Sequence, residues 1–368
     1  MIGDAAKSSV TIRTARHQAS VRHSEPEHPK FENVYLSDVG NIPYVIDQTF
    51  GVEIEITTRS GVPEMNEEWR KTGTEIAKCL AQFATSPVCP GALNYHENCD
   101  HSRWVVERDC SAGWEVVSPI LQNAEGFLEL QRICDGLTEF VSNSNLHINY
   151  RTGLHVTLGT RLNTDERLRG FMKRIQRLEP GLFTLVSPSR LYGFDGYDYD
   201  TDVWNEYCMP IRESITDVEN LRIDEFVDEE DTRYHSVNLT HAYKDVQKLE
   251  IRMHSGTTEF QKIAPWISLW MQIFNRSRYA WEGNGYDGDV FNEPDKELDQ
   301  DEAQREDIFH LLEAEGIYLN ADMLRLLTNR RTQLRKSWEK VIPKRVSSWA
   351  RAGWYATSAQ TSTATPST

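Results

Sequence analysis

Two glutamates stand two residues apart in the segment Phe50–Ile56, FGVEIEI, where charged and apolar residues alternate. This period of two is typical of a β-strand with one buried face, so Glu53 and Glu55 are expected to point to the same side. Two carboxylates placed in this way repel each other unless a cation lies between them. Mg²⁺ prefers such oxygen ligands. The pair therefore indicates a metal site, with a solvated strand face as the alternative.

Three further strand-like segments carry side chains of the same kind among apolar neighbours. They are Glu115 in 114–121, His155 in 153–159, and Glu250, Arg252 and His254 in 248–256. The last three recur at every second residue, so we expect them to share one face. A sheet that gathers these faces combines metal-binding acids with a fixed positive charge, which suits phosphoryl chemistry. Solvated strand faces and structural histidines are the alternatives.

Five other polar residues are candidates for contacts with a substrate or nucleotide. Asp109 and Ser111 lie at the expected turn of a hairpin, where they could be a ligand and a hydrogen-bond partner or an ordinary Asp–Ser turn. Arg233, with Asn238 five residues later, could bind a phosphate or a carboxylate, and a surface ion pair is the alternative. Arg190 is a weaker candidate of the same kind.

The hydrophobic pattern predicts about six strands and four helices that position these residues. Strands are expected over 50–58, 103–109, 114–121, 153–159, 234–241 and 248–256, and helices over 66–84, 125–144, 164–180 and 260–281. Strands joined as hairpins favour an α+β fold, with a largely antiparallel, curved sheet and helices packed on one face. The sequence has no glycine fingerprint for dinucleotides or phosphate loops, which excludes Rossmann and P-loop chemistry.

Composition divides the chain into a body and several polar segments. We expect a flexible N-terminal extension (1–44), a catalytic domain (45–282), an acidic loop (283–307), a helical basic segment (308–357) and a disordered tail (358–368). The basic segment is expected to dock on the acidic body, with a nucleic-acid-binding tail as the alternative.

The charge and cysteine content exclude several classes of protein. With 40 Lys and Arg against 56 Asp and Glu, the formal net charge is −16, which opposes non-specific binding of nucleic acid. No apolar run reaches the roughly 18–20 residues that cross a bilayer, and the N-terminus lacks the apolar centre of a secretory signal. The 6 cysteines include no CxxC pair. A reduced, cytoplasmic protein with no membrane partner is therefore expected.

Six segments occur in a characteristic order along the chain. They are FGVEIE (50–55), Asp109–Ser111, WEVVSPIL (114–121), TGLHV (152–156), RYHSVNL (233–239) and LEIRMHSGTTEFQKIAPWI (249–267). Over about residues 49–280 this set resembles the amidoligase family, which is related to glutamate–cysteine ligase and, more distantly, to glutamine synthetase. The resemblance implies a glutamine-synthetase-like antiparallel sheet whose concave face binds ATP and Mg²⁺. It also implies ATP-dependent joining of a carboxylate to an amine.

The resemblance also implies roles for individual residues. The metal- and phosphate-proximal positions are Glu53, Glu55, Glu115, His155 and Glu250. Arg252 corresponds to the arginine near the transferred phosphate, and Asp109 and Arg233 to residues that shape the substrate or nucleotide pocket. The family often has a second histidine two residues after the first. Here that position is Thr157, which cannot replace an imidazole as a ligand or base.

These observations lead to the hypothesis of an ATP-dependent carboxylate–amine ligase that works through an acyl phosphate with Mg²⁺. Glu53, Arg252 and Asp109 are its predicted catalytic residues, and Arg233, Arg252 and Asn238 are predicted to bind the nucleotide. Its partners would be small-molecule or peptide carboxylates and amines. One alternative is a metal-dependent hydrolase or phosphotransferase that uses the same acids. The other is a non-catalytic interaction protein that retains the fold.

Overall fold

The computed structural model contains a nine-stranded sheet, most of it antiparallel. It describes residues 29–94, 102–160, 165–194, 199–211, 233–242, 247–276 and 307–345. The main path of the sheet runs β12 (Val237–Asn238), β13 (Lys248–Ser255), β9 (Gly153–Gly159), β3 (Thr49–Thr58), β6 (Gly113–Val117), β5 (Trp104–Asp109) and β4 (Val88–Leu93). Only the pairing of β4 with β5 is parallel among the described strands. The predicted α+β class with a largely antiparallel sheet is confirmed.

The short strands β7 (Leu121–Gln122) and β8 (Leu146–His147) also pair with β3. β6 and β7 together replace the single strand predicted over 114–121. Pro119 lies in the gap between them, and proline cannot donate the ladder hydrogen bond of a strand interior. β3 is therefore flanked on one side by β6 and β7 and on the other by β9. β8 pairs with the C-terminal end of β3.

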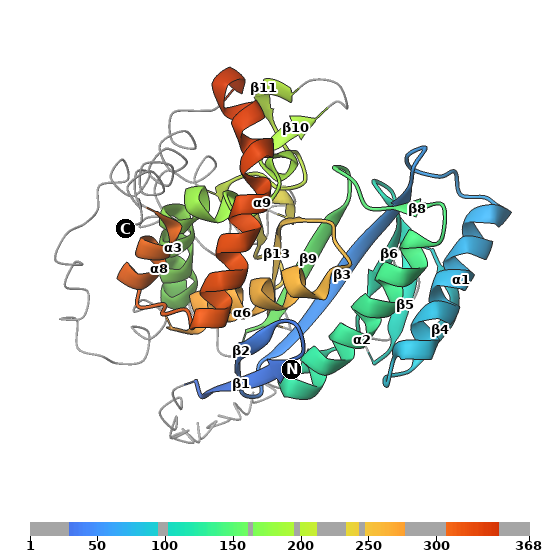
Figure 1. The fold of residues 1–368 in the computed structure, drawn as a ribbon, viewed down its shortest axis with the longest axis horizontal. Helices are drawn as coiled ribbons and strands as arrows, with labels where there is room; N and C mark the ends of the chain where they lie inside the picture. The colour runs from blue at the N-terminus through green and yellow to red at the C-terminus, as the bar shows by residue number, and fades with distance from the viewer. Residues whose placement is uncertain are drawn as a thin grey trace, which may run out of the picture.

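Three helices cover one face of the sheet: α1 (Glu67–Phe83), α2 (Asn123–Ser142) and α6 (Phe260–Arg276), as Figure 1 shows. Apolar residues of β3 point toward them. The ring centroid of Phe50 lies 4.8 Å from that of Phe127 on α2. The indole N–H of Trp69 on α1 donates to the carbonyl of Gly113 at 2.8 Å. Because strand side chains alternate, Glu53 and Glu55 lie on the opposite face.

Residues 31–45 form a packed hairpin, so the flexible extension predicted for 1–44 is wrong over this part. β1 (Phe31–Leu36) pairs with β2 (Gly40–Val45), and both strands bury apolar side chains in the core. The hydroxyl of Ser268 on α6 donates to the carbonyl of Pro43 at 2.6 Å. This contact fixes the hairpin against the helical layer. Residues 1–28 lie outside the described part of the chain.

The C-terminal part contains the predicted helices. α8 (Ile308–Ala314) and α9 (Ala321–Arg345) are joined by the ion pair of Arg331 with Asp307 at 2.8 Å. The indole N–H of Trp338 donates to the carbonyl of Val186 at 3.0 Å, so α9 contacts the body of the fold at this point. The acidic segment up to residue 306 and the tail after residue 345 lie outside the described residues.

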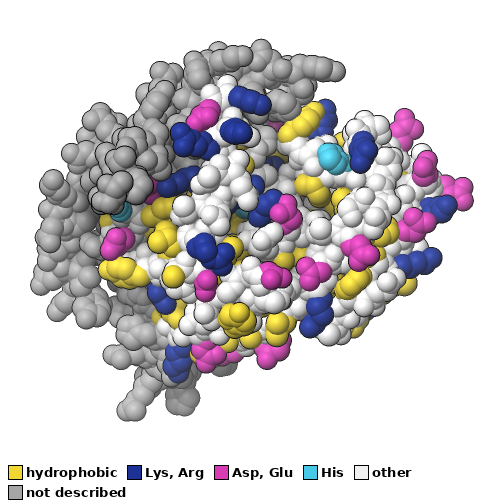
Figure 2. Space-filling model, viewed as in Figure 1, with side chains coloured by type: hydrophobic (Ala, Val, Ile, Leu, Met, Phe, Trp, Pro, Cys, Tyr) yellow, Lys and Arg dark blue, Asp and Glu magenta, His cyan; other side chains and the backbone are white. Residues whose placement is uncertain are grey.

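The remaining described elements connect these layers. They are α3 (Asp165–Phe183), the 3₁₀ turn η1 (Pro188–Arg190) and the hairpin of β10 (Tyr192–Phe194) with β11 (Tyr199–Trp204). None of the helices in the described ranges has the length and apolar character that crossing a bilayer requires. On the face shown in Figure 2, acidic and basic side chains are interspersed, with apolar groups between them. The acidic excess of the chain is therefore not gathered on this face.

Candidate active site

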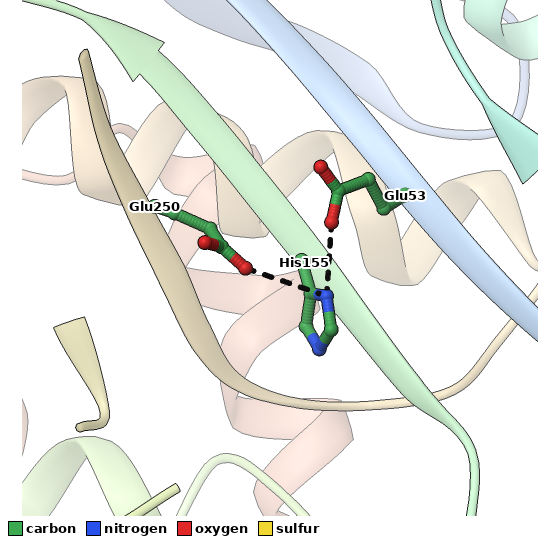
Figure 3. Close-up of side chains that lie close together, drawn as sticks. All are labelled: Glu53, His155 and Glu250. Atoms are coloured by element: carbon green, nitrogen blue, oxygen red, sulfur yellow. Dashed lines mark hydrogen bonds and ion pairs between the residues drawn. The ribbon is translucent and has the colours of Figure 1, made fainter. Parts of the chain in front are cut away.

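His155 lies among carboxylates on the face of the sheet opposite α1, α2 and α6. Its Nδ1 atom is 3.1 Å from Glu53 and 3.5 Å from Glu250 (Figure 3), and its Nε2 atom is 3.4 Å from Glu55. Glu115 is 3.8 Å from Nδ1. The strand register explains the convergence, because Glu53 pairs with His155 and Glu55 with Glu115 across antiparallel ladders. The structure thus brings together five residues singled out in the sequence.

Two overlapping groups of potential ligands share His155. One consists of Glu53, His155 and Glu250, and the other of Glu55, Glu115 and His155. In each group the ligand atoms lie within 4.8 Å of one another. Carboxylate oxygens with one imidazole nitrogen form a donor set that suits Mg²⁺ or Mn²⁺.

Burial strongly perturbs two of the carboxyl groups. It raises the pKa of Glu55 to about 7, with a further contribution from the charge of Asp109 and opposition from Arg190. Burial also raises the pKa of Glu115 well above its ordinary value, and the neighbouring Glu53 acts in the same direction. Buried acids that repel one another in this way are stabilised as anions when a cation joins them. The residues present therefore fit a divalent cation.

Burial and the charge of Arg252 lower the pKa of the His155 imidazole to about 3. The ring is therefore neutral near pH 7, which is the form that binds a metal ion. Its position between the two groups of carboxylates allows either ring nitrogen to be a ligand. No proton has to leave His155 before one of its ring nitrogens binds a cation, and in that neutral form the other nitrogen keeps its proton.

Glu250 is held in place by two neighbours. Asn238, on the paired strand β12, donates a hydrogen bond from its amide to Glu250 at 2.8 Å. Arg252, which lies on β13 as Glu250 does, forms an ion pair with it. The same amide group of Asn238 accepts hydrogen bonds from Thr240. Asn238, predicted to bind nucleotide, therefore contacts a potential metal ligand. Thr157 lies opposite Glu250 in the register of β9 and β13.

Arg252 remains charged in this setting. Burial lowers its pKa, but Glu250 and Glu53 outweigh that effect and raise it above its ordinary value. Its Nε atom donates to the carbonyl of Tyr207 at 3.2 Å. The guanidinium is thus fixed beside the carboxylates, where the sequence predicted it.

The expectation that His254 shares this face is wrong because β13 contains a bulge. The register shifts between Ile251, which pairs with Val156, and His254, which pairs with Leu154. One extra residue reverses the alternation of side chains. The His254 ring consequently packs against Trp266 of α6, with ring centroids 5.2 Å apart, and its Nδ1 atom lies 2.6 Å from the carbonyl of Ser255.

Asp109 occupies the hairpin turn that the sequence predicted. One of its oxygens accepts hydrogen bonds from the backbone N–H of Ser111 at 2.8 Å, from the Ser111 hydroxyl at 2.6 Å and from Ala112 at 2.5 Å. These bonds are those of an Asp–Ser turn. The charge of Asp109 also raises the pKa of Glu55 and Glu115, so it contributes to the field of the site.

The contact that the structure describes for Arg233 is with Tyr234, and no carboxylate of the cluster is among its described partners. Arg233 is exposed, and its guanidinium stacks over the ring of Tyr234 at 4.6 Å from the centroid. The ring of Tyr234 in turn packs edge-on against that of Tyr207, with ring centroids 6.0 Å apart. Since Arg252 contacts the Tyr207 carbonyl, this aromatic pair connects Arg233 to the site.

Glu107 is a site residue that the sequence reasoning missed. It is buried, pairs with Glu115 across β5 and β6, and raises the pKa of that residue. The signal was present in the sequence, because Glu107 stands two residues before Asp109 in the predicted strand, the same spacing as Glu53 and Glu55.

Residues 47–274 match the model of a protein family described as "Putative amidoligase enzyme". This chain belongs to the amidoligase family. All five residues of the two ligand groups lie within the matched range. The resemblance seen in the sequence is thereby confirmed.

Two solved structures are similar to the amidoligase chain. One is described as "Crystal structure of novel glutamine synthase homolog", with a TM-score of 0.40 and 12% identity over 84% of this chain and 70% of that chain. The other, "GmaS/ADP complex-Conformation 1", has a TM-score of 0.39 and 13% identity over 83% of this chain and 72% of that one. No curated protein sequence matches the chain.

Proposed function

We propose that this amidoligase is an ATP-dependent ligase that joins a carboxylate to an amine through an acyl phosphate. The observation that carries the proposal is the convergence of Glu53, Glu55, Glu115, His155 and Glu250 from four strands of one sheet. Family membership supports the reaction class.

The two groups around His155 would hold the divalent cations, and Asn238 and Arg252 would keep Glu250 oriented toward them. When bound, the cations would neutralise phosphate oxygens of the nucleotide. Orienting contacts of this kind are those that raise the affinity of a metal site beyond the contribution of its direct ligands.

In the proposed reaction, a carboxylate oxygen of the substrate attacks the terminal phosphorus of ATP, and the bond from that phosphorus to ADP breaks. The amine nitrogen then attacks the acyl carbon, phosphate leaves, and the nitrogen loses a proton. Arg252 offsets the negative charge that develops on the phosphoryl oxygens, because its guanidinium is fixed and permanently charged. Forming the amide becomes favourable because the acyl group is activated first.

The test is an assay of purified protein with Mg-ATP and a cell extract. We expect ADP, together with a product whose mass is one water less than the sum of two consumed compounds, detected by mass spectrometry. Glu53→Gln should abolish both, and Glu75→Gln, an exposed position on α1, should leave both unchanged.

Two results would contradict the proposal. Phosphate release that requires no amine would favour the hydrolase or phosphotransferase. Absence of Mg-ATP binding in calorimetry would favour a non-catalytic protein.

A further inference from the structure

Arg190 is a buried cation at the edge of the carboxylate cluster. It ends the turn η1, with only 3% of its surface exposed. Its Nη2 atom donates to the carbonyl of Arg252 at 2.7 Å, while its Nε atom is buried without a hydrogen-bond partner. The guanidinium also forms a hydrogen bond with the thiol of Cys208, which is a weak acceptor. It forms no ion pair with a carboxylate in the part of the chain that the structure describes.

A charge in this position is costly unless an anion accompanies it. Burial of an ionised group without a direct counter-ion costs several kcal/mol in general, about the cost that an ion pair or a bound ligand offsets. Arg252 differs in this respect, because Glu250 and the carbonyl of Tyr207 already bind its guanidinium. Of the two arginines, Arg190 has the greater unused capacity to bind an anion.

The missing side chain of Gly153 allows Arg190 to approach the potential metal ligands. A Cβ atom on Gly153 would lie 3.3 Å from Nη1 of Arg190, 3.0 Å from Nε2 of His155 and 3.3 Å from Oε1 of Glu55. The backbone N–H of Gly153 donates to the other oxygen of Glu55 at 2.6 Å. Arg190 therefore reaches the same small region as the group formed by Glu55, Glu115 and His155.

We propose that Arg190 binds the γ-phosphate of ATP in this region, an inference that rests on the proposed function. The terminal phosphate carries the most negative charge of the proposed reactants, so it gains most from an arginine beside a cation site. The planar guanidinium has donors that match phosphate oxygens, and its burial fixes their direction before the ligand arrives. ADP lacks this phosphate and does not use Arg190.

The test compares the binding of two nucleotides by calorimetry in the presence of Mg²⁺. We expect Arg190→Gln to weaken the binding of the non-hydrolysable ATP analogue AMP-PNP by about tenfold or more, the usual scale of a charge-assisted contact. The affinity for ADP should change less than about twofold on the same scale. Arg190→Lys, which keeps the charge but loses the planar fork, should weaken only AMP-PNP and by less. Arg132→Gln, at an exposed position on α2, should change neither affinity.

The outcomes separate this inference from the proposed function. If the unmodified protein binds both nucleotides and Arg190→Gln affects both equally or neither, the assignment of Arg190 is wrong while the proposed function stands. If the unmodified protein binds neither nucleotide, both are wrong. Thermal unfolding of each variant identifies misfolding, and Arg190→Lys provides the test if Arg190→Gln does not fold.

Discussion

The buried carboxyl of Glu55 predicts an unusual dependence of stability on pH in the absence of a metal ion. Its pKa is about 7 in the folded protein and close to its ordinary value of 4.5 in the unfolded chain. The difference corresponds to about 3 kcal/mol against the ionised form. Because the folded-state pKa is the higher one, the folded protein is most stable while Glu55 is protonated. This contribution of Glu55 to the free energy of unfolding is complete below about pH 4.5 and is lost as the pH rises through 7. Glu115 shifts in the same direction.

The assay is urea unfolding in the presence of EDTA at pH 5, 6, 7 and 8, followed by tryptophan fluorescence. We expect Glu55→Gln to be more stable than the unmodified protein at pH 8, because the amide cannot ionise, and to differ little from it at pH 5. Mn²⁺ added in excess of the EDTA should restore the stability of the unmodified protein at pH 8 and have a smaller effect on Glu55→Gln. Glu75→Gln, at an exposed site, is the matched control. If Glu55→Gln has the same or lower stability at pH 8, the buried-carboxyl reasoning is refuted.

Three further predictions test individual contacts. Asn238→Ala should weaken Mn²⁺ binding by roughly 10–100-fold, because Glu250 loses an orienting hydrogen bond; an unchanged affinity by electron paramagnetic resonance would contradict this. Gly153→Ala should also weaken Mn²⁺ binding, since the added methyl would lie 3.0 Å from His155 and displace it; calorimetry showing full affinity would indicate that the site adapts. His254→Phe should bind Mn²⁺ normally while His155→Phe does not, and equal losses would place both histidines in one site.

Much of the sheet was predictable because its central strands alternate clearly. β3 and β13 combine a buried apolar face with charged residues, so their positions follow from the period of two. β4 was not predicted because Pro90 and Gly91 interrupt its sequence. A strand at the edge of the described sheet tolerates both residues, since a ladder is required on one side only. The β1–β2 hairpin lies in a polar context that hides its few core positions.

The site was predictable wherever register follows from simple alternation. Glu53, Glu55, Glu115, His155 and Glu250 converge as the hypothesis required. A bulge cannot be read from alternation, and for that reason the expected position of His254 was wrong. The importance of Arg190 depends on burial and on the absence of a side chain at Gly153, which only the folded arrangement reveals.

The most direct test of the central claim is a crystal structure with Mn²⁺ and AMP-PNP, with Mn²⁺ located by its anomalous scattering. We predict peaks within the two groups that share His155, one with Glu53 and Glu250 and the other with Glu55 and Glu115. The triphosphate should lie against the same face of the sheet. Ordered Mn²⁺ and nucleotide bound elsewhere, with these side chains still paired only to one another, would contradict the account.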